Sequence, residues 1–141
     1  MGAEGCENDV FSKERILHVK ISGNSMYPVI SNGDVVIVKS KIKYIPGDII
    51  VFIYKGSLLV HRLIKIENGR YFCKGDNSFR LEDIEPSQII GFVILDSDPH
   101  RNDTFIKHSY EINRLFRANG YNHAKTMISK EYQKYKDNYL S

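Results

Sequence analysis

Ser25 and His61 are two side chains of the sequence that could together cleave a bond. Ser25 stands in a turn-forming segment, GNSMYP at residues 23–28. Such a turn can hold a hydroxyl at the end of a strand and leave backbone N–H groups facing an oxyanion. His61 stands in an apolar, strand-like segment, VHRL at residues 60–63. Because imidazole titrates near neutral pH, it suits a base that removes a serine proton.

Each of these side chains also has an ordinary structural explanation. A serine among Gly, Asn and Pro is usually a turn residue, and a histidine in an apolar strand is more often a hydrogen-bonded core residue. A carboxylate follows the next predicted strand, at Asp76 in the segment KGDNS (74–78). It could orient a histidine on the neighbouring strand. Residue types alone therefore leave both interpretations open.

Six short apolar segments predict the strands that would position these side chains. Turn signals such as NGD (32–34), PGD (46–48) and NG (68–69) separate several of them. The predicted strands are residues 16–21, 35–38, 49–54, 58–66, 70–73 and 89–95. Their continuous apolar runs favour strands buried on both faces or a closed sheet. The sequence thus predicts a mainly β fold, a coiled antiparallel sheet or partly open β-barrel.

The hydrophobic period changes after residues 96–103. Ile112, Leu115 and Phe116 share one helical face, and a second helical face runs from Ala124 to Tyr139. This predicts a C-terminal helical extension, most simply packed against the β domain. The expected division is a flexible lead-in (1–15), a β catalytic domain (16–98) and a basic helical tail (99–141).

The composition of the sequence excludes a disordered, collagen-like or coiled-coil chain. Hydrophobic residues make up 42% and charged residues 26%, which is a globular composition. The net charge of +3 collects in residues 101–141, which hold 8 Lys/Arg against 4 Asp/Glu. We interpret it as a solvated helix face and expect no nucleic-acid partner. The two cysteines, Cys6 and Cys73, match no metal motif, so we expect neither a metal nor a cofactor.

The order of the motifs resembles the type I signal peptidases and the related self-cleaving peptidases of the LexA type. Ser-Met-x-Pro, two Gly-Asp turns each entering a strand, Val-His-Arg and Lys-Gly-Asp-Asn follow one another across about residues 16–95. The resemblance implies the partly open β-barrel fold of that superfamily and a serine endopeptidase. It implies that Ser25 is the nucleophile and His61 the general base, where many members carry lysine.

The same resemblance implies the surroundings of this pair. Asp76 matches an acidic motif of the family, and Asp83 is the nearest candidate for a further downstream aspartate. Either could orient His61. The residues expected around the oxyanion and the substrate are Gly23, Asn24, Met26 and Pro28, with Met26 lining the cleft or packing beneath it. Substrate would bind as an added strand, along sheet edges expected near residues 35–38 and 58–61.

Signal peptidases normally carry a transmembrane helix before the serine, and the polar start of this sequence has no such segment. We therefore expect a soluble, cytoplasmic member, peripheral at the membrane at most, that matures a peptide or protein precursor. Two alternatives stay open. One is a degenerate peptidase fold that binds a peptide or partner; the other is a self-cleaving LexA-like regulator. The sequence does not set the oligomeric state.

Overall fold

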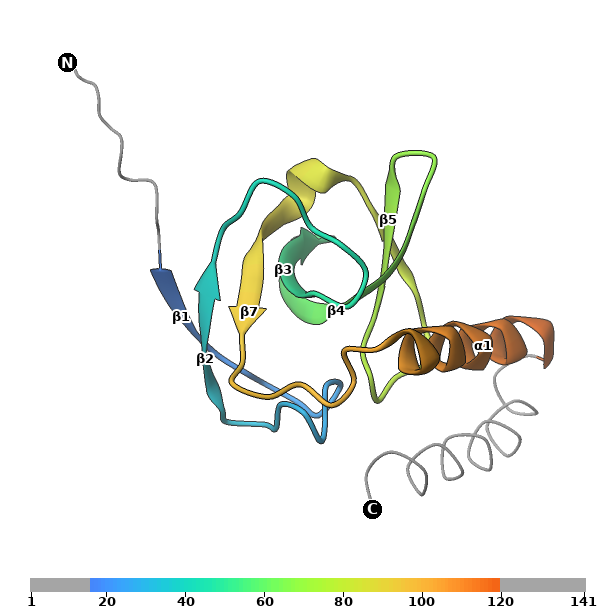
Figure 1. Cartoon of the computed structure of the whole chain (residues 1–141), viewed down its shortest axis with the longest axis horizontal. Helices are drawn as coiled ribbons and strands as arrows, with labels where there is room; N and C mark the ends of the chain where they lie inside the picture. Colours follow the sequence, from blue (N-terminus) through green and yellow to red (C-terminus); the bar gives the residue numbers. More distant parts are fainter. Residues whose placement is uncertain (1–15, 120–141) are drawn as a thin grey trace.

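A single curled antiparallel sheet carries the fold, in a computed structural model that describes residues 16–119. Figure 1 shows the sheet wrapped around a central hairpin, with one helix outside it. The strands are β1 (Ile16–Lys20), β2 (Val35–Lys39), β3 (Ile49–Tyr54), β4 (Ser57–Glu67), β5 (Arg70–Lys74), β6 (Glu82–Ile84) and β7 (Ile89–Ile94). A short 3₁₀ helix (Pro86–Gln88) precedes β7, and α1 spans Asp103–Asn119. The predicted mainly β class and half-open curled sheet are confirmed.

The strand order is β1-β2-β7-β3-β4-β5-β6, and every neighbouring pair is antiparallel. The last strand of the described residues, β7, thus lies between β2 and β3. Two tight hairpins have residues with positive φ in their turns: Lys55 and Gly56 between β3 and β4, and Asn68 and Gly69 between β4 and β5. Two successive positive φ values match the twist of paired strands, and Asn-Gly adopts them readily.

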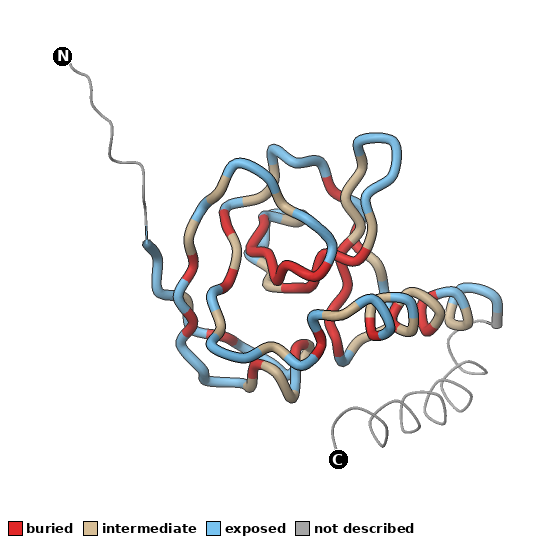
Figure 2. Tube along the Cα trace, in the orientation of Figure 1, coloured by how far each residue is buried: buried red, intermediate tan, exposed pale blue. Residues whose placement is uncertain are grey.

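Burial concentrates in the central hairpin, as Figure 2 shows in red. The first four residues of β3 are at most 2% exposed, so the prediction that apolar runs mark strands buried on both faces holds for β3. It is wrong for β2, where exposed Val35 and Ile37 alternate with buried residues. One apolar cluster packs Val36, Val51 and Val93 from β2, β3 and β7. A second packs Phe52, Leu63 and Cys73 from β3, β4 and β5.

The helix α1 begins at Asp103 and lies beside β4, outside the curl. The side-chain oxygen of Asn102 accepts a hydrogen bond from the Phe105 backbone N–H (2.8 Å), as an N-terminal cap does. The predicted helical face at Ile112, Leu115 and Phe116 packs against Phe79. The second predicted helical segment and the lead-in lie outside the described residues.

The structure corrects two expectations about strands. First, a seventh strand, β6, was missed because its three residues, Glu-Asp-Ile, contain one apolar side chain. Second, the sheet ends at β1 and β6, whereas residues 35–38 and 58–61 lie in strands with neighbours on both sides. The pairing of β4 with β5 nevertheless begins only at Arg62, so residues 57–61 pair with β3 alone. Within the part of the chain that the structure describes, no helix is long and apolar enough to cross a membrane.

Candidate active site

The turn between β1 and β2 presents Ser25. Gly23 adopts φ +89°, which a side chain would disfavour, and its N–H donates to the Asn32 side-chain oxygen at 2.7 Å. Beneath the turn, Met26 is 1% exposed and packs into the core. Ser25 is half-buried, and among residues 16–119 its backbone N–H makes no hydrogen bond. The turn therefore leaves both the hydroxyl and one amide proton available.

The central strand β4 places His61 against this turn. The His61 Nε2 atom lies 3.1 Å from Ser25 Oγ, although 36 positions separate the two residues. The ring is 8% exposed and packs edge-on against Phe52, with ring centroids 6.3 Å apart. The structure thus brings together the two side chains that the sequence proposed as nucleophile and base.

The carboxylate that orients His61 is Glu82, on β6. Its Oε1 lies 2.7 Å from His61 Nδ1, and both side chains are largely buried. A carboxylate at this nitrogen favours the tautomer that carries the proton on Nδ1, which leaves Nε2 to accept a proton from serine. The expectation that Asp76 or Asp83 would fill this position is wrong on geometry, because both carboxylates have other partners.

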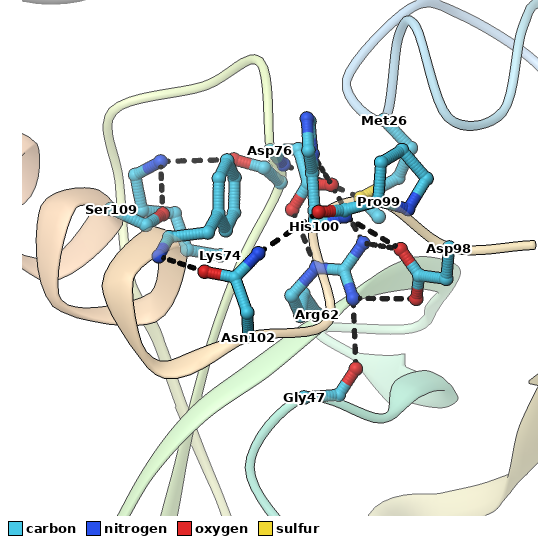
Figure 3. Close-up of polar contacts among 12 residues, drawn as sticks. Met26, Gly47, Arg62, Lys74, Asp76, Asp98, Pro99, His100, Asn102 and Ser109 are labelled. Atoms are coloured by element: carbon cyan, nitrogen blue, oxygen red, sulfur yellow. Dashed lines mark hydrogen bonds and ion pairs between the residues drawn. The ribbon is translucent and has the colours of Figure 1, made fainter. Parts of the chain in front are cut away.

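Asp76 is fully buried and has partners other than His61. Both of its oxygens accept hydrogen bonds from Arg62 at 2.9 Å, and Oδ2 also lies 2.7 Å from His100 Nδ1. Burial alone would raise the pKa of the Asp76 carboxyl. The hydrogen bonds from His100 and Arg62 and their charges outweigh burial and lower that pKa. Asp76 is therefore an ionised partner in a structural network (Figure 3).

Asp83 points away from the site. Because side chains alternate along a strand, it faces the side opposite Glu82. It is exposed, and Oδ1 accepts a hydrogen bond from Arg70 Nε at 2.7 Å. Asp83 therefore belongs to a surface ion pair.

The loop after β5, residues 75–78, contacts both members of the Ser25–His61 pair. The Asn77 backbone N–H donates to the Ser25 carbonyl oxygen at 2.8 Å. A Cβ built on Gly75 would lie 2.7 Å from that same carbonyl oxygen and 3.1 Å from His61 Nε2. Both distances are shorter than van der Waals contact, so this position requires glycine.

The other residues expected around the oxyanion hold the turn together. The Asn24 carbonyl accepts from the Asn77 side chain at 3.0 Å, and its own side-chain oxygen lies 3.4 Å from the Asn32 N–H. Pro28 is half-buried. Because Met26 is buried in the core, it packs beneath the Ser25 turn and does not line the surface around Ser25.

Lys74 is a site neighbour that sequence reasoning missed. The side chain is completely buried, and Nζ donates to the Gly75 carbonyl (3.1 Å) and to Ser109 Oγ (2.8 Å). Burial lowers the pKa of the ammonium to about 8, although the charges of Asp76 and Glu82 oppose the shift. Lys74 stands in the Lys-Gly-Asp-Asn motif, but the motif by itself predicts no role for it, since its partner Ser109 lies 35 positions away.

Glu82 did leave a signal in the sequence. In a strand over residues 82–84, Glu82 shares a face with buried Ile84. Recognition of that strand would have pointed to the glutamate, because the alternation turns Asp83 outward. Among residues 16–119, no group of three or more His, Cys, Asp or Glu side chains is placed to hold a metal ion.

The curled antiparallel sheet is of the kind expected for the LexA and signal peptidase superfamily, and it holds a serine, a histidine and a carboxylate in one hydrogen-bonded chain. The family model described as Peptidase S24-like matches residues 5–94, well over half of the chain. The chain therefore belongs to the Peptidase S24-like family, whose members are serine peptidases and LexA-like self-cleaving regulators. A search of curated proteins finds no match to the chain.

Proposed function

We propose that this protein is a serine endopeptidase that cleaves a peptide or protein precursor through Ser25, His61 and Glu82. The observation that carries the proposal is the continuous hydrogen-bonded chain, 3.1 Å from Ser25 Oγ to His61 Nε2 and 2.7 Å from His61 Nδ1 to Glu82. These distances lie within the reach needed for proton transfer between a nucleophile and its base.

The chemistry follows from this geometry. His61 Nε2 accepts the Ser25 proton as Oγ attacks the scissile carbonyl carbon, while the ionised Glu82 stabilises the imidazolium that forms. The Ser25 backbone N–H donates to the oxyanion. The imidazolium then protonates the leaving amine as the acyl-enzyme forms. Water, deprotonated by His61, attacks the acyl carbon and releases Ser25.

The part of β4 that pairs with β3 but not with β5 could bind a substrate in extended conformation. Residues 57–61 have backbone groups directed away from β3 that β5 does not pair. A peptide that added as a strand here would run directly to His61. The neighbouring Leu58 side chain is 47% exposed, so this edge also presents apolar surface to such a peptide.

A cleavage assay tests the proposal. Purified protein is incubated with a library of unstructured peptides, and the products are identified by mass spectrometry. Wild-type protein should cleave a subset of the peptides, and both Ser25→Ala and His61→Ala should abolish cleavage. Equal cleavage by either alanine variant would refute the proposed nucleophile and base.

The dependence of the cleavage rate on protein concentration distinguishes a self-cleaving regulator from a peptidase that acts on added substrate. A protein that cuts its own chain loses mass at a first-order rate that dilution does not change, and it leaves added peptides intact. A degenerate, purely binding fold would retain peptides on a column without cleaving them. The proposal requires turnover of added peptide.

A further inference from the structure

The segment after the family-matched residues makes contacts that reach the candidate active site. The match ends at residue 94, and the chain then continues through Asp98 and His100 into α1. Figure 3 shows that side chains from this segment converge on Lys74, Asp76 and Arg62. These three residues lie at, or beside, the loop that touches Ser25.

Three hydrogen bonds anchor that loop at three successive points. Ser109 Oγ accepts from Lys74 Nζ at 2.8 Å, at the start of the loop. His100 Nδ1 lies 2.7 Å from Asp76 Oδ2, in its middle. At its end, the Asn113 side-chain amide donates to the Phe79 carbonyl at 2.8 Å.

The anchoring side chains are themselves held firmly. Ser109 and Asn113 are buried on the face of α1 that looks toward the sheet, at 1% and 3% exposed. His100 stacks on Phe105, with ring centroids 4.0 Å apart and planes 12° apart. The Lys74–Ser109 and Asp76–His100 bonds are buried on both sides, so removing one partner there leaves a polar group that water reaches poorly. The Asn113–Phe79 bond is partly buried.

We propose that residues 98–113 form a positioning element for the proposed peptidase, with Ser109 and Asn113 holding the 74–79 loop where it contacts Ser25 and His61. The inference rests on the proposed function for its catalytic consequence. The coupling itself does not depend on catalysis. In it, α1 sets the position of the loop, and the loop sets the position of the Ser25 turn through Asn77. Ser109 and Asn113 touch neither substrate nor the reacting atoms.

Amide hydrogen exchange tests this coupling without any substrate. The reporter is the Asn77 N–H, which donates to the Ser25 carbonyl. The reference is the Leu63 N–H, which donates to the Asp48 carbonyl at 2.8 Å. Ser109→Ala and Asn113→Ala should each speed exchange at Asn77 on the order of tenfold and leave Leu63 unchanged, since local opening is separable from global unfolding.

Two further variants serve as controls. Ser109→Thr keeps the hydroxyl and should restore the wild-type exchange rate at Asn77. Arg114→Ala alters an exposed side chain of the same helix, whose partner is Glu111 on that helix, and should leave Asn77 unchanged. An unchanged Asn77 rate in both alanine variants, or an equal acceleration at Asn77 and Leu63, would overturn the proposal.

The catalytic consequence is measured separately. In the peptide assay, Ser109→Ala should lower kcat on the order of tenfold with KM nearly unchanged, because a small displacement of the nucleophile impairs the reaction more than binding. A KM increase at constant kcat would overturn the positioning role. If wild-type protein cleaves nothing, the proposed function fails, while the exchange experiment still decides whether α1 holds the loop.

Discussion

Glu82 and the two aspartates near it differ in environment, and substitutions that remove one charge each should separate their roles. Glu82→Gln should lower kcat on the order of a hundredfold or more, because the imidazolium loses its stabilising charge and the tautomer is no longer fixed. The measurement is steady-state peptide cleavage, with circular dichroism to check the fold.

Asp83→Asn is the matched control for that experiment, since Asp83 is exposed and bonded to Arg70 at the surface. Surface ion pairs contribute at most about 1 kcal/mol, so neither activity nor stability should change much. A greater loss of activity in Asp83→Asn than in Glu82→Gln would contradict the assignment of Glu82.

Lys74 gives the protein a pH dependence of known sign. Its pKa in the folded state is about 8, against an ordinary value of 10.5, so the unfolded state binds more protons between these pH values. The free energy of unfolding should therefore rise with pH across this window. Relative to Lys74→Met, wild-type protein should gain about 3 kcal/mol between pH 7 and pH 11.

Chemical denaturation at several pH values measures this difference. Lys20→Met, at an exposed position of β1, reports the effect of removing a lysine in general. If the difference between wild type and Lys74→Met stayed constant over the window, the buried ammonium would not titrate as described.

At the residue scale, the sequence could predict that Ser25 and His61 lie together but not that Glu82 bonds His61. Ser25 and His61 stand in motifs whose types and order are specific. Glu82 stands in a three-residue strand whose direction depends on pairing with β5, and pairing is a long-range property. Asp76 was predicted from the Lys-Gly-Asp-Asn motif and Asp83 as the nearest downstream aspartate, and in this chain the carboxylate of that motif binds Arg62.

The loop between β5 and β6 is the element on which the site depends most. Gly75→Ala would place a Cβ 2.7 Å from the Ser25 carbonyl oxygen, which is backbone and cannot rotate away. The loop and the turn must then separate. We expect kcat to fall on the order of a hundredfold, with a smaller change in stability.

Gly56→Ala is the matched control, because it should lower stability without lowering kcat. Gly56 has φ +80°, and no atom lies within 4 Å of the position that a Cβ would occupy there, so alanine strains the hairpin turn without touching the site. Stability should fall by about 1 kcal/mol while kcat stays at the wild-type value. Equal kcat values for the two variants would exclude the steric argument at Gly75.

Element prediction succeeded where local patterns suffice. The Asn68-Gly69 hairpin and the strands around it follow from turn chemistry and β-branched runs. The sheet edges could not be inferred in the same way, because β7 enters the sheet between strands that precede it by more than thirty positions. The division of the chain into lead-in, catalytic and tail regions stays a prediction.

Arg62 links distant parts of the whole molecule. Its guanidinium donates to Asp76, to Asp98 (2.8 and 3.0 Å) and to the Gly47 carbonyl (2.8 Å), and the side chain is fully buried. Arg62→Met leaves two carboxylates without their main partner. We expect a loss of about 3–5 kcal/mol in the free energy of unfolding, measured by urea denaturation.

Arg70→Met is the matched substitution at the surface. Arg70 also bonds two carboxylates, Asp83 and Glu85, but all three side chains are exposed to solvent. Its replacement should change the free energy of unfolding much less than Arg62→Met does, because solvent screens these charges. Similar losses for the two variants would mean that burial does not determine the strength of the Arg62 network.

The position of β7 has a consequence for biosynthesis. Ser25 belongs to the β1–β2 hairpin, and His61 and Glu82 belong to the β3–β6 meander. Within residues 16–119, these two halves join in the sheet only through β7, which follows all the other strands in the sequence. On the ribosome, Ser25 and His61 therefore lie on segments that no strand pairing joins until residues 89–94 have emerged. We therefore expect the proposed peptidase to complete its sheet, and with it the Ser25–His61–Glu82 arrangement, only after β7 has been synthesised.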